Sequence, residues 1–141
     1  MRRLKKILKR PDLLFALIAS VCGFTWALLV PPFQVPDEIG HYHRSLEISY
    51  GQFLPNPLAR QGGSVLPKNF DLLVDSLGSK DIRWDSSKKQ DLGRLNSASR
   101  IPFGEWTFQK NDTSTWIYPP ILYMPQAVGA FIATKAGLNM V

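Results

Sequence analysis

A single apolar run constrains the fold of this chain more than any other feature. Residues 13–30, LLFALIASVCGFTWALLV, are eighteen positions without a charged side chain. At about 1.5 Å per residue, an α-helix of this length approaches the ~30 Å of a bilayer hydrocarbon core. Trp26 lies near the far end of the run, where interfacial aromatic residues are common. The run therefore favours a membrane helix over the buried helix of a soluble domain.

A short basic tail precedes the run. The first ten residues, MRRLKKILKR, hold six of the 17 Lys and Arg residues. The positive-inside rule places such a tail in the cytoplasm and residue 31 outside it. Residues 31–116 carry ten basic and ten acidic side chains, so the net charge of +6 comes from the tail. A nucleic-acid-binding domain would carry its excess on one folded face, so we expect the lipid bilayer as partner and no nucleic acid.

Two other interpretations of the same segment are weaker. A cleaved signal peptide has an apolar core of about 7–15 residues followed by a small-residue cleavage site. This run is longer and ends in Leu-Leu-Val-Pro-Pro. Cys22 lacks the preceding residues expected of a lipoprotein cysteine, and as the only cysteine it cannot form an intrachain disulfide. We interpret Cys22 as an ordinary thiol within a retained anchor.

The second half of the chain ends in another apolar segment. Prolines interrupt its start at positions 119, 120 and 125, and no charge follows until Lys135. Near a membrane such prolines are tolerated where neighbouring groups satisfy the freed carbonyls. We therefore expect an α-helical membrane protein, with two transmembrane helices flanking a large extracytoplasmic loop that contains short helices. Its parts are a basic cytoplasmic tail (1–12), transmembrane helix 1 (13–30), the extracytoplasmic loop (31–116), and an interfacial segment with transmembrane helix 2 (117–141).

The loop shows local order at its start. Pro36 and Gly51 mark plausible ends of a helix near residues 36–50. A second short helix is predicted near 71–77, and a turn over residues 60–64. Residues 79–99 are polar and poor in large apolar side chains, which indicates flexibility.

An ionisable cluster lies where the chain leaves the first apolar run. Placed on a helix, its residues form two neighbouring stripes. The first stripe is Asp37, His41, Arg44 and Ile48, and the second is Glu38, Tyr42, Ser45 and Ser49. Acidic residues in a first helical turn are stabilised by the helix dipole, and Arg44 with Glu47 could form an ordinary exposed pair. A structural role alone would explain this arrangement in a soluble loop.

The position at a membrane boundary favours a functional role, because charges at membrane depth tend to face cavities or substrates. A carboxylate beside a partly dry cavity can act as a general base. Arginine and histidine one or two turns away could hold a phosphate. Asp37 and His41 could also ligate a divalent metal from one helix face, but no recognised ligand spacing is present, so we predict no metal site and leave the cofactor unknown.

Two elements of the sequence resemble a known family. PPFQVPDE (31–38), followed by His41 and Arg44, and YPPILYMP (118–125) together resemble the N-terminal part of the DUF2142 family of predicted multi-pass membrane proteins. That family is similar to the GT-C class of membrane glycosyltransferases. The resemblance implies a multi-pass cell-membrane protein, of which this chain would be the N-terminal portion.

The resemblance also implies roles for particular residues. Asp37, with Glu38 as its neighbour or substitute, would be the catalytic base that activates an acceptor. His41 and Arg44 would contact the phosphate of a polyprenyl-phosphate sugar donor. Tyr118 and Tyr123, at the start of the second apolar segment, are further candidate substrate contacts. The chain would be an enzyme only as part of a longer multi-pass protein.

The length of 141 residues supports a different hypothesis. A small non-enzymatic membrane protein could use its outer loop to bind a protein partner in a cell-envelope complex. Crosslinks from residues 79–99 to a stoichiometric protein would favour this alternative, and crosslinks to a lipid-linked sugar would favour the enzyme.

Overall fold

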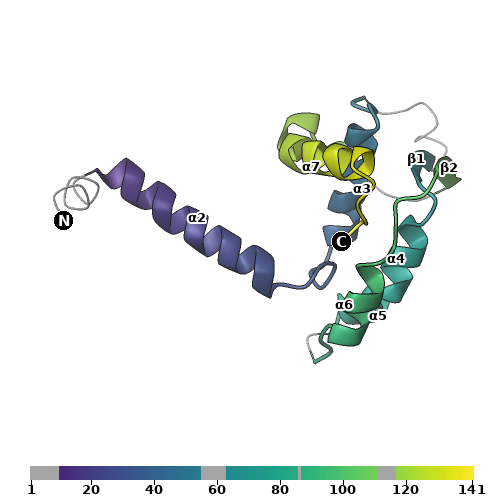
Figure 1. The fold of residues 1–141 in the computed structure, drawn as a ribbon, viewed down its shortest axis with the longest axis horizontal. Helices are drawn as coiled ribbons and strands as arrows, with labels where there is room; N and C mark the ends of the chain where they lie inside the picture. The colour runs from purple at the N-terminus through teal and green to yellow at the C-terminus, as the bar shows by residue number, and fades with distance from the viewer. Residues whose placement is uncertain (1–9, 55–62, 86, 111–116) are drawn as a thin grey trace. The chain divides into compact units, whose positions relative to one another are not determined.

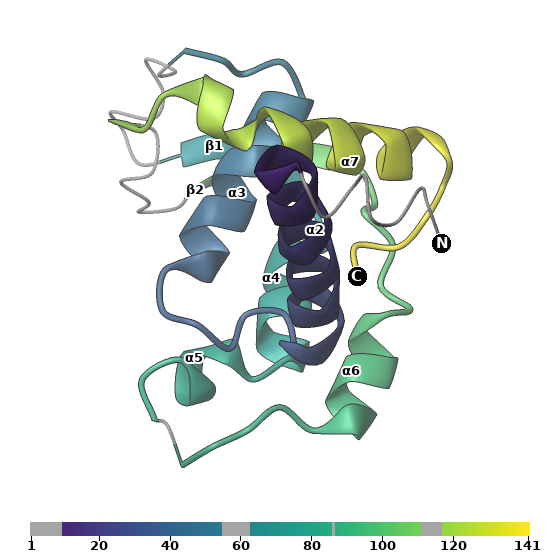
Figure 2. The same cartoon turned by 90° about the vertical axis from the view of Figure 1, so that its left-hand side faces the viewer.

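The computed structural model describes residues 10–54, 63–85, 87–110 and 117–141. The chain divides into two compact units, residues 1–31 and residues 32–141. Figures 1 and 2 show their helices and strands from two directions.

The first unit contains helix α2 (Pro11–Leu29), which covers most of the predicted apolar run. Pro11 occupies the first turn, where its missing N–H is not needed. The helix ends at the residue before Val30, because Pro31 and Pro32 cannot continue the hydrogen-bonding pattern. Most of its described large apolar side chains are exposed, among them Phe15, Phe24 and Trp26. Within the described residues, we find no helix that is both long enough and apolar enough to span a bilayer.

The second unit is built on the packing of two helices, α3 (Glu38–Ser49) and α7 (Met124–Lys135). Figure 1 shows α7 lying across α3. Helix α3 is the one predicted near residues 36–50. Buried residues from many segments form one core. Its members are Phe33, Leu46, Leu66, Phe70, Leu73, Val74, Leu77, Ala98, Ile101, Phe103, Ala130 and Met140.

A two-stranded antiparallel sheet, which the sequence analysis did not predict, lies against α3. Strand β1 (Gly63–Pro67) pairs with β2 (Trp106–Lys110), in a register that places Val65 opposite Phe108. A turn was expected over residues 60–64. Residues 63 and 64 instead begin β1, and residues 60–62 lie outside the described residues.

Three short helices fill the connection between the strands. They are α4 (Phe70–Ser76), α5 (Ser79–Ile82) and α6 (Leu92–Ala98). Helix α4 confirms the helix predicted near 71–77. Residues 79–99, where we expected flexibility, contain α5 and α6, and Ile82 and Ala98 of these helices are buried.

The C-terminal segment differs from the expected second transmembrane helix. It forms a 3₁₀ turn, η3 (Pro120–Tyr123), followed by α7. The 12 residues of α7 rise about 18 Å, against a hydrocarbon core of ~30 Å. The helix ends because Gly137 adopts a left-handed conformation with φ of 67°. The chain then turns back, and the Met140 N–H donates to the Ile101 carbonyl at 3.0 Å.

Candidate functional site

The start of α3 is held in an unusual backbone conformation. Phe33 and Asp37 have φ of 61° and 68° and are the non-glycine residues with positive φ in the described part of the chain. Such a conformation costs about 1–3 kcal/mol for a residue with a side chain and persists only where the surroundings impose it. Phe33 is buried in the core, which offsets part of that cost. Strain of this kind is common at functional sites.

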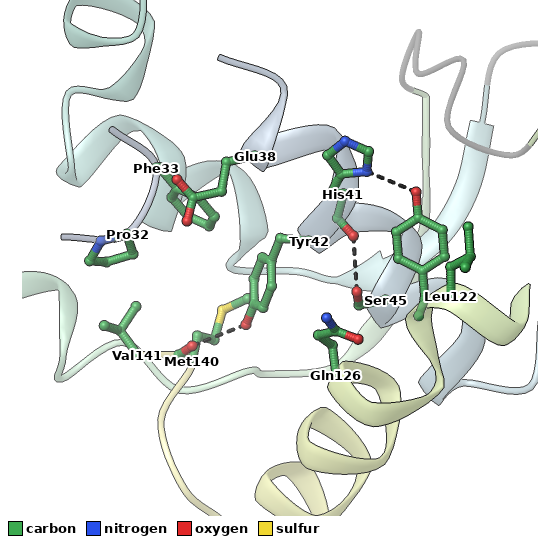
Figure 3. Close-up of a pocket in the computed structure, with 11 residues that line it drawn as sticks. Pro32, Phe33, Glu38, His41, Tyr42, Ser45, Leu122, Gln126, Met140 and Val141 are labelled. Carbon is green, nitrogen blue, oxygen red and sulfur yellow. Dashed lines mark hydrogen bonds between the residues drawn. The ribbon is translucent and has the colours of Figure 1, made fainter. Parts of the chain in front are cut away.

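A pocket opens beside this strained segment. It has a volume of about 590 Å³. Its lining comes from the segment before α3, one face of α3, the η3–α7 region and the C-terminal residues (Figure 3). The lining residues are Pro32, Phe33, Glu38, His41, Tyr42, Ser45, Leu122, Tyr123, Gln126, Met140 and Val141. Mostly apolar walls with a few polar groups are typical of a small-molecule site.

The polar groups of the pocket are fixed by contacts across the fold. His41 Nδ1 lies 2.8 Å from the Tyr123 hydroxyl, and the two rings stack at 5.8 Å between centroids. The Tyr118 ring lies at the same centroid distance from His41. Because Tyr123 engages Nδ1, the Nε2 atom of His41 is the nitrogen available to a ligand, as a donor or an acceptor according to tautomer.

Tyr42 also lines the pocket and is held at its hydroxyl. Its hydroxyl donates to the Met140 carbonyl at 3.0 Å. Burial raises the pKa of Tyr42 to about 12, so the hydroxyl stays protonated and keeps this donor role at neutral pH. The hydroxyl of Ser45 donates to the His41 carbonyl at 2.9 Å, which leaves its oxygen as an acceptor.

The structure brings together three of the predicted site residues. Glu38, His41 and Tyr123 all line the pocket, and Tyr118 packs against His41. Asp37, the first choice as base, is exposed and is not among the lining residues. The side chain of Glu38 is half-buried, and one of its oxygens lies 3.4 Å from the Val35 amide.

Arg44 lies in a separate, buried network. Its guanidinium donates to Glu47 Oε2 at 2.9 Å and to the carbonyls of Gln52 and Phe53 at 3.2 and 3.0 Å. The pair that we expected to be exposed is buried, with 1% of Arg44 and 5% of Glu47 accessible. These contacts direct the guanidinium toward protein acceptors rather than toward the pocket.

His43 belongs to the same buried region. Its Nε2 atom lies 3.1 Å from the Ser64 hydroxyl, and its Nδ1 atom lies 3.6 Å from Glu47 Oε1. The ring meets Phe70 edge-on at 5.6 Å between centroids. Burial lowers the pKa of His43 to about 4, and the Arg44 charge acts in the same direction. His43 is therefore neutral at pH 7.

Some pocket residues were missed as candidates. Tyr42 and Ser45 share the helical stripe of Glu38, so the sequence held a signal for them in that spacing. Gln126 and Met140 come from segments that approach α3 only in the folded chain, and no local pattern points to them. Within the described residues, no group of three His, Cys, Asp or Glu side chains is placed to hold a metal ion.

Comparison with known protein families finds a match for most of the chain. The model of the family described as "Predicted membrane protein (DUF2142)" matches residues 21–141, which include every pocket residue. The chain belongs to the DUF2142 family. Neither a curated protein nor a solved structure matches it. As a DUF2142 member the chain is assigned to the membrane, in agreement with the resemblance seen in its two proline-rich elements.

Proposed function

We propose that the chain is the N-terminal part of a GT-C-like membrane glycosyltransferase that takes a sugar from a polyprenyl-phosphate donor. Helix α2 would anchor it in the cell membrane, and the topology proposed from the sequence puts the N-terminus in the cytoplasm and residues 31–116 outside. The single observation that carries the proposal is that Glu38, His41 and Tyr123 converge on one largely apolar pocket.

The pocket offers groups for each part of the reaction. The Glu38 carboxylate would remove the proton from an acceptor hydroxyl as its oxygen bonds to the anomeric carbon. The bond from that carbon to the phosphate oxygen breaks, and the polyprenyl phosphate leaves as the anion. His41, through Nε2, would contact the phosphate, and the apolar walls would hold the adjoining hydrocarbon.

The geometry favours Glu38 over Asp37 within the pair that the resemblance implies. A base must reach the bound acceptor, and Glu38 lines the pocket whereas Asp37 does not. Asp37 instead occupies the N-cap position of α3, without a side-chain capping hydrogen bond.

Replacing Glu38 with glutamine is expected to lower the transfer rate by about a hundredfold or more, because the neutral amide cannot accept the proton. Asp37→Asn is the matched control, since it removes the neighbouring charge without entering the pocket. The measurement is incorporation of labelled sugar from lipid-linked donors by membranes that contain the full-length protein. A Glu38→Gln protein with unchanged transfer would remove Glu38 as the base, and a loss confined to Asp37→Asn would move the role to that residue.

The anchoring role of α2 has its own test at Cys22. This thiol is exposed on α2, so in a membrane-inserted helix it would face lipid, which a charged reagent does not enter. We expect Cys22 to resist a charged, membrane-impermeant maleimide in vesicles and to react once detergent is added. Lys89→Cys in a Cys22→Ser chain should react from the outer side. Full labelling of Cys22 in intact vesicles would contradict anchoring by α2.

A non-enzymatic partner-binding role is the second candidate. The observation that favours it is a set of exposed apolar side chains on η3 and α7, with Ile121 73% and Ile132 58% accessible. A photocrosslinker at position 121 distinguishes the roles. A stoichiometric protein adduct, with transfer unaffected by Glu38→Gln, would favour partner binding over catalysis.

A further inference from the structure

A second pocket lies at the C-terminal end of α3 and shares no residue with the first. Its volume is about 330 Å³. It is lined by residues from α3, β2 and α7, namely Ser49, Tyr50, Trp106, Phe131, Thr134 and Lys135. Half of these six residues are aromatic, and none is acidic.

The aromatic side of this pocket is fixed in place. Tyr50 and Trp106 stack with 4.8 Å between ring centroids and 15° between ring planes. Trp106 is held by the β-ladder, where it pairs with Pro67, and Tyr50 follows the last turn of α3. Tyr50 remains 52% accessible, so part of the stacked pair is open to a ligand. Fixed aromatic surface of this kind suits the apolar C–H face of a sugar ring.

The polar side of the pocket can accept hydrogen bonds and bind negative charge. The Ser49 hydroxyl donates to the Leu46 carbonyl at 2.7 Å, and the Thr134 hydroxyl donates to the Ala130 carbonyl at 2.8 Å. Their protons are therefore engaged, and their oxygens are left as acceptors for ligand hydroxyls. Lys135 adds an exposed ammonium group, 5.7 Å from the centre of the Phe131 ring.

The C-terminal carbonyl groups of α7, which lie beside Lys135, repel a bound anion only weakly. Free carbonyl groups at a helix C-terminus carry partial negative charge. In α7 the carbonyls of Ile132, Ala133 and Thr134 accept from the amides of Ala136, Leu138 and Gly137. This capping leaves the Lys135 charge as the main electrostatic feature of the pocket.

We propose that this second pocket binds a hexose that carries a negatively charged group, a carboxylate or a phosphate. The sugar ring packs on the Tyr50–Trp106 pair, its hydroxyls donate to Ser49 and Thr134, and its anionic group pairs with Lys135. The site would hold a saccharide separately from the Glu38 pocket. Its existence does not depend on transferase activity.

Saturation-transfer NMR on the full chain in nanodiscs tests the proposal. The probes are glucose, glucuronate and glucose 6-phosphate at equal concentration. We expect one or both anionic sugars to bind more tightly than glucose, and their comparison identifies the preferred anion. Lys135→Gln should lower that preference about three- to fivefold, as for an exposed ion pair. Lys89→Gln removes an equal charge from the segment between α5 and α6 and should have no effect.

Tyr50→Ala tests the stacking surface without removing a core residue. It should abolish most sugar saturation while the circular dichroism spectrum stays unchanged. Absence of saturation with all three sugars, equal binding of glucose and the anionic sugars, or full binding by Tyr50→Ala would each overturn the proposal. Glu38→Gln should bind these sugars normally, so failure of the transferase proposal and failure of this one give different results.

Discussion

Arg44→Met is expected to destabilise the second unit by about 3–5 kcal/mol, the usual cost of removing one partner from a buried ion pair. The substitution leaves the Glu47 carboxylate buried without its cation. It also removes the donors to the Gln52 and Phe53 carbonyls, which hold the chain that leaves α3. The free energy of opening can be measured by hydrogen exchange of the α3 amides in the full chain in nanodiscs.

Two matched variants separate charge from geometry at Arg44. Arg44→Lys keeps the charge but cannot form the same branched set of bonds, so we expect an intermediate loss. Arg44→Met combined with Glu47→Met removes both charges and should recover part of the stability lost in the single variant. Unchanged α3 protection in Arg44→Met would show that the pair does not stabilise the fold.

Acidification should destabilise the same unit through His43. The pKa of His43 is lowered from 6.5 to about 4 in the folded chain, first by burial and second by the Arg44 charge. The unfolded chain therefore binds more protons between these values, and stability is lost as pH falls from about 6.5 toward 4. A shift of this size corresponds to about 3 kcal/mol. Hydrogen exchange of the α3 amides at pH 6.5 and pH 4.5, corrected for the pH dependence of intrinsic exchange, measures most of this loss in the free energy of unfolding.

His43→Gln is the control for this pH dependence. The carboxylates of the chain titrate in both proteins, so the difference between the two pH profiles isolates the histidine. Glu47 and Arg44 both face His43, and each remains in the variant. We expect the variant to be less stable at pH 7 but to lose less stability on acidification. Parallel profiles would show that His43 does not couple folding to pH.

Local patterns in the sequence were sufficient for part of the fold. Pro36 and Gly51 delimit α3, and a run of apolar residues marks α2. The sheet was not predictable, because each strand has only five residues and they pair across a long connection. Short strands of this kind depend on the tertiary contacts that they make rather than on their own composition.

In the candidate site, too, some residues were predictable from local sequence patterns and others were not. Helical spacing placed Glu38 and His41 on neighbouring stripes, and both line the pocket. Spacing suggested the pair with Glu47, but it could not show that the guanidinium of Arg44 also donates to two backbone carbonyls beyond Gly51, those of Gln52 and Phe53. Tyr123 was a candidate for a different reason, its place at the start of the second apolar segment, and only the folded chain shows that it engages His41.

The hydrogen bond from Tyr42 to Met140 has a consequence for biosynthesis. Its partners are 98 residues apart in the sequence, so at ~5–20 residues per second a ribosome adds the second about 5–20 s after the first. Near the end of that interval α3 has been made while α7 and Met140, which pack against it, have not. A nascent chain in this state exposes apolar surface that is prone to aggregation, and slow codons between positions 42 and 140 would prolong that exposure.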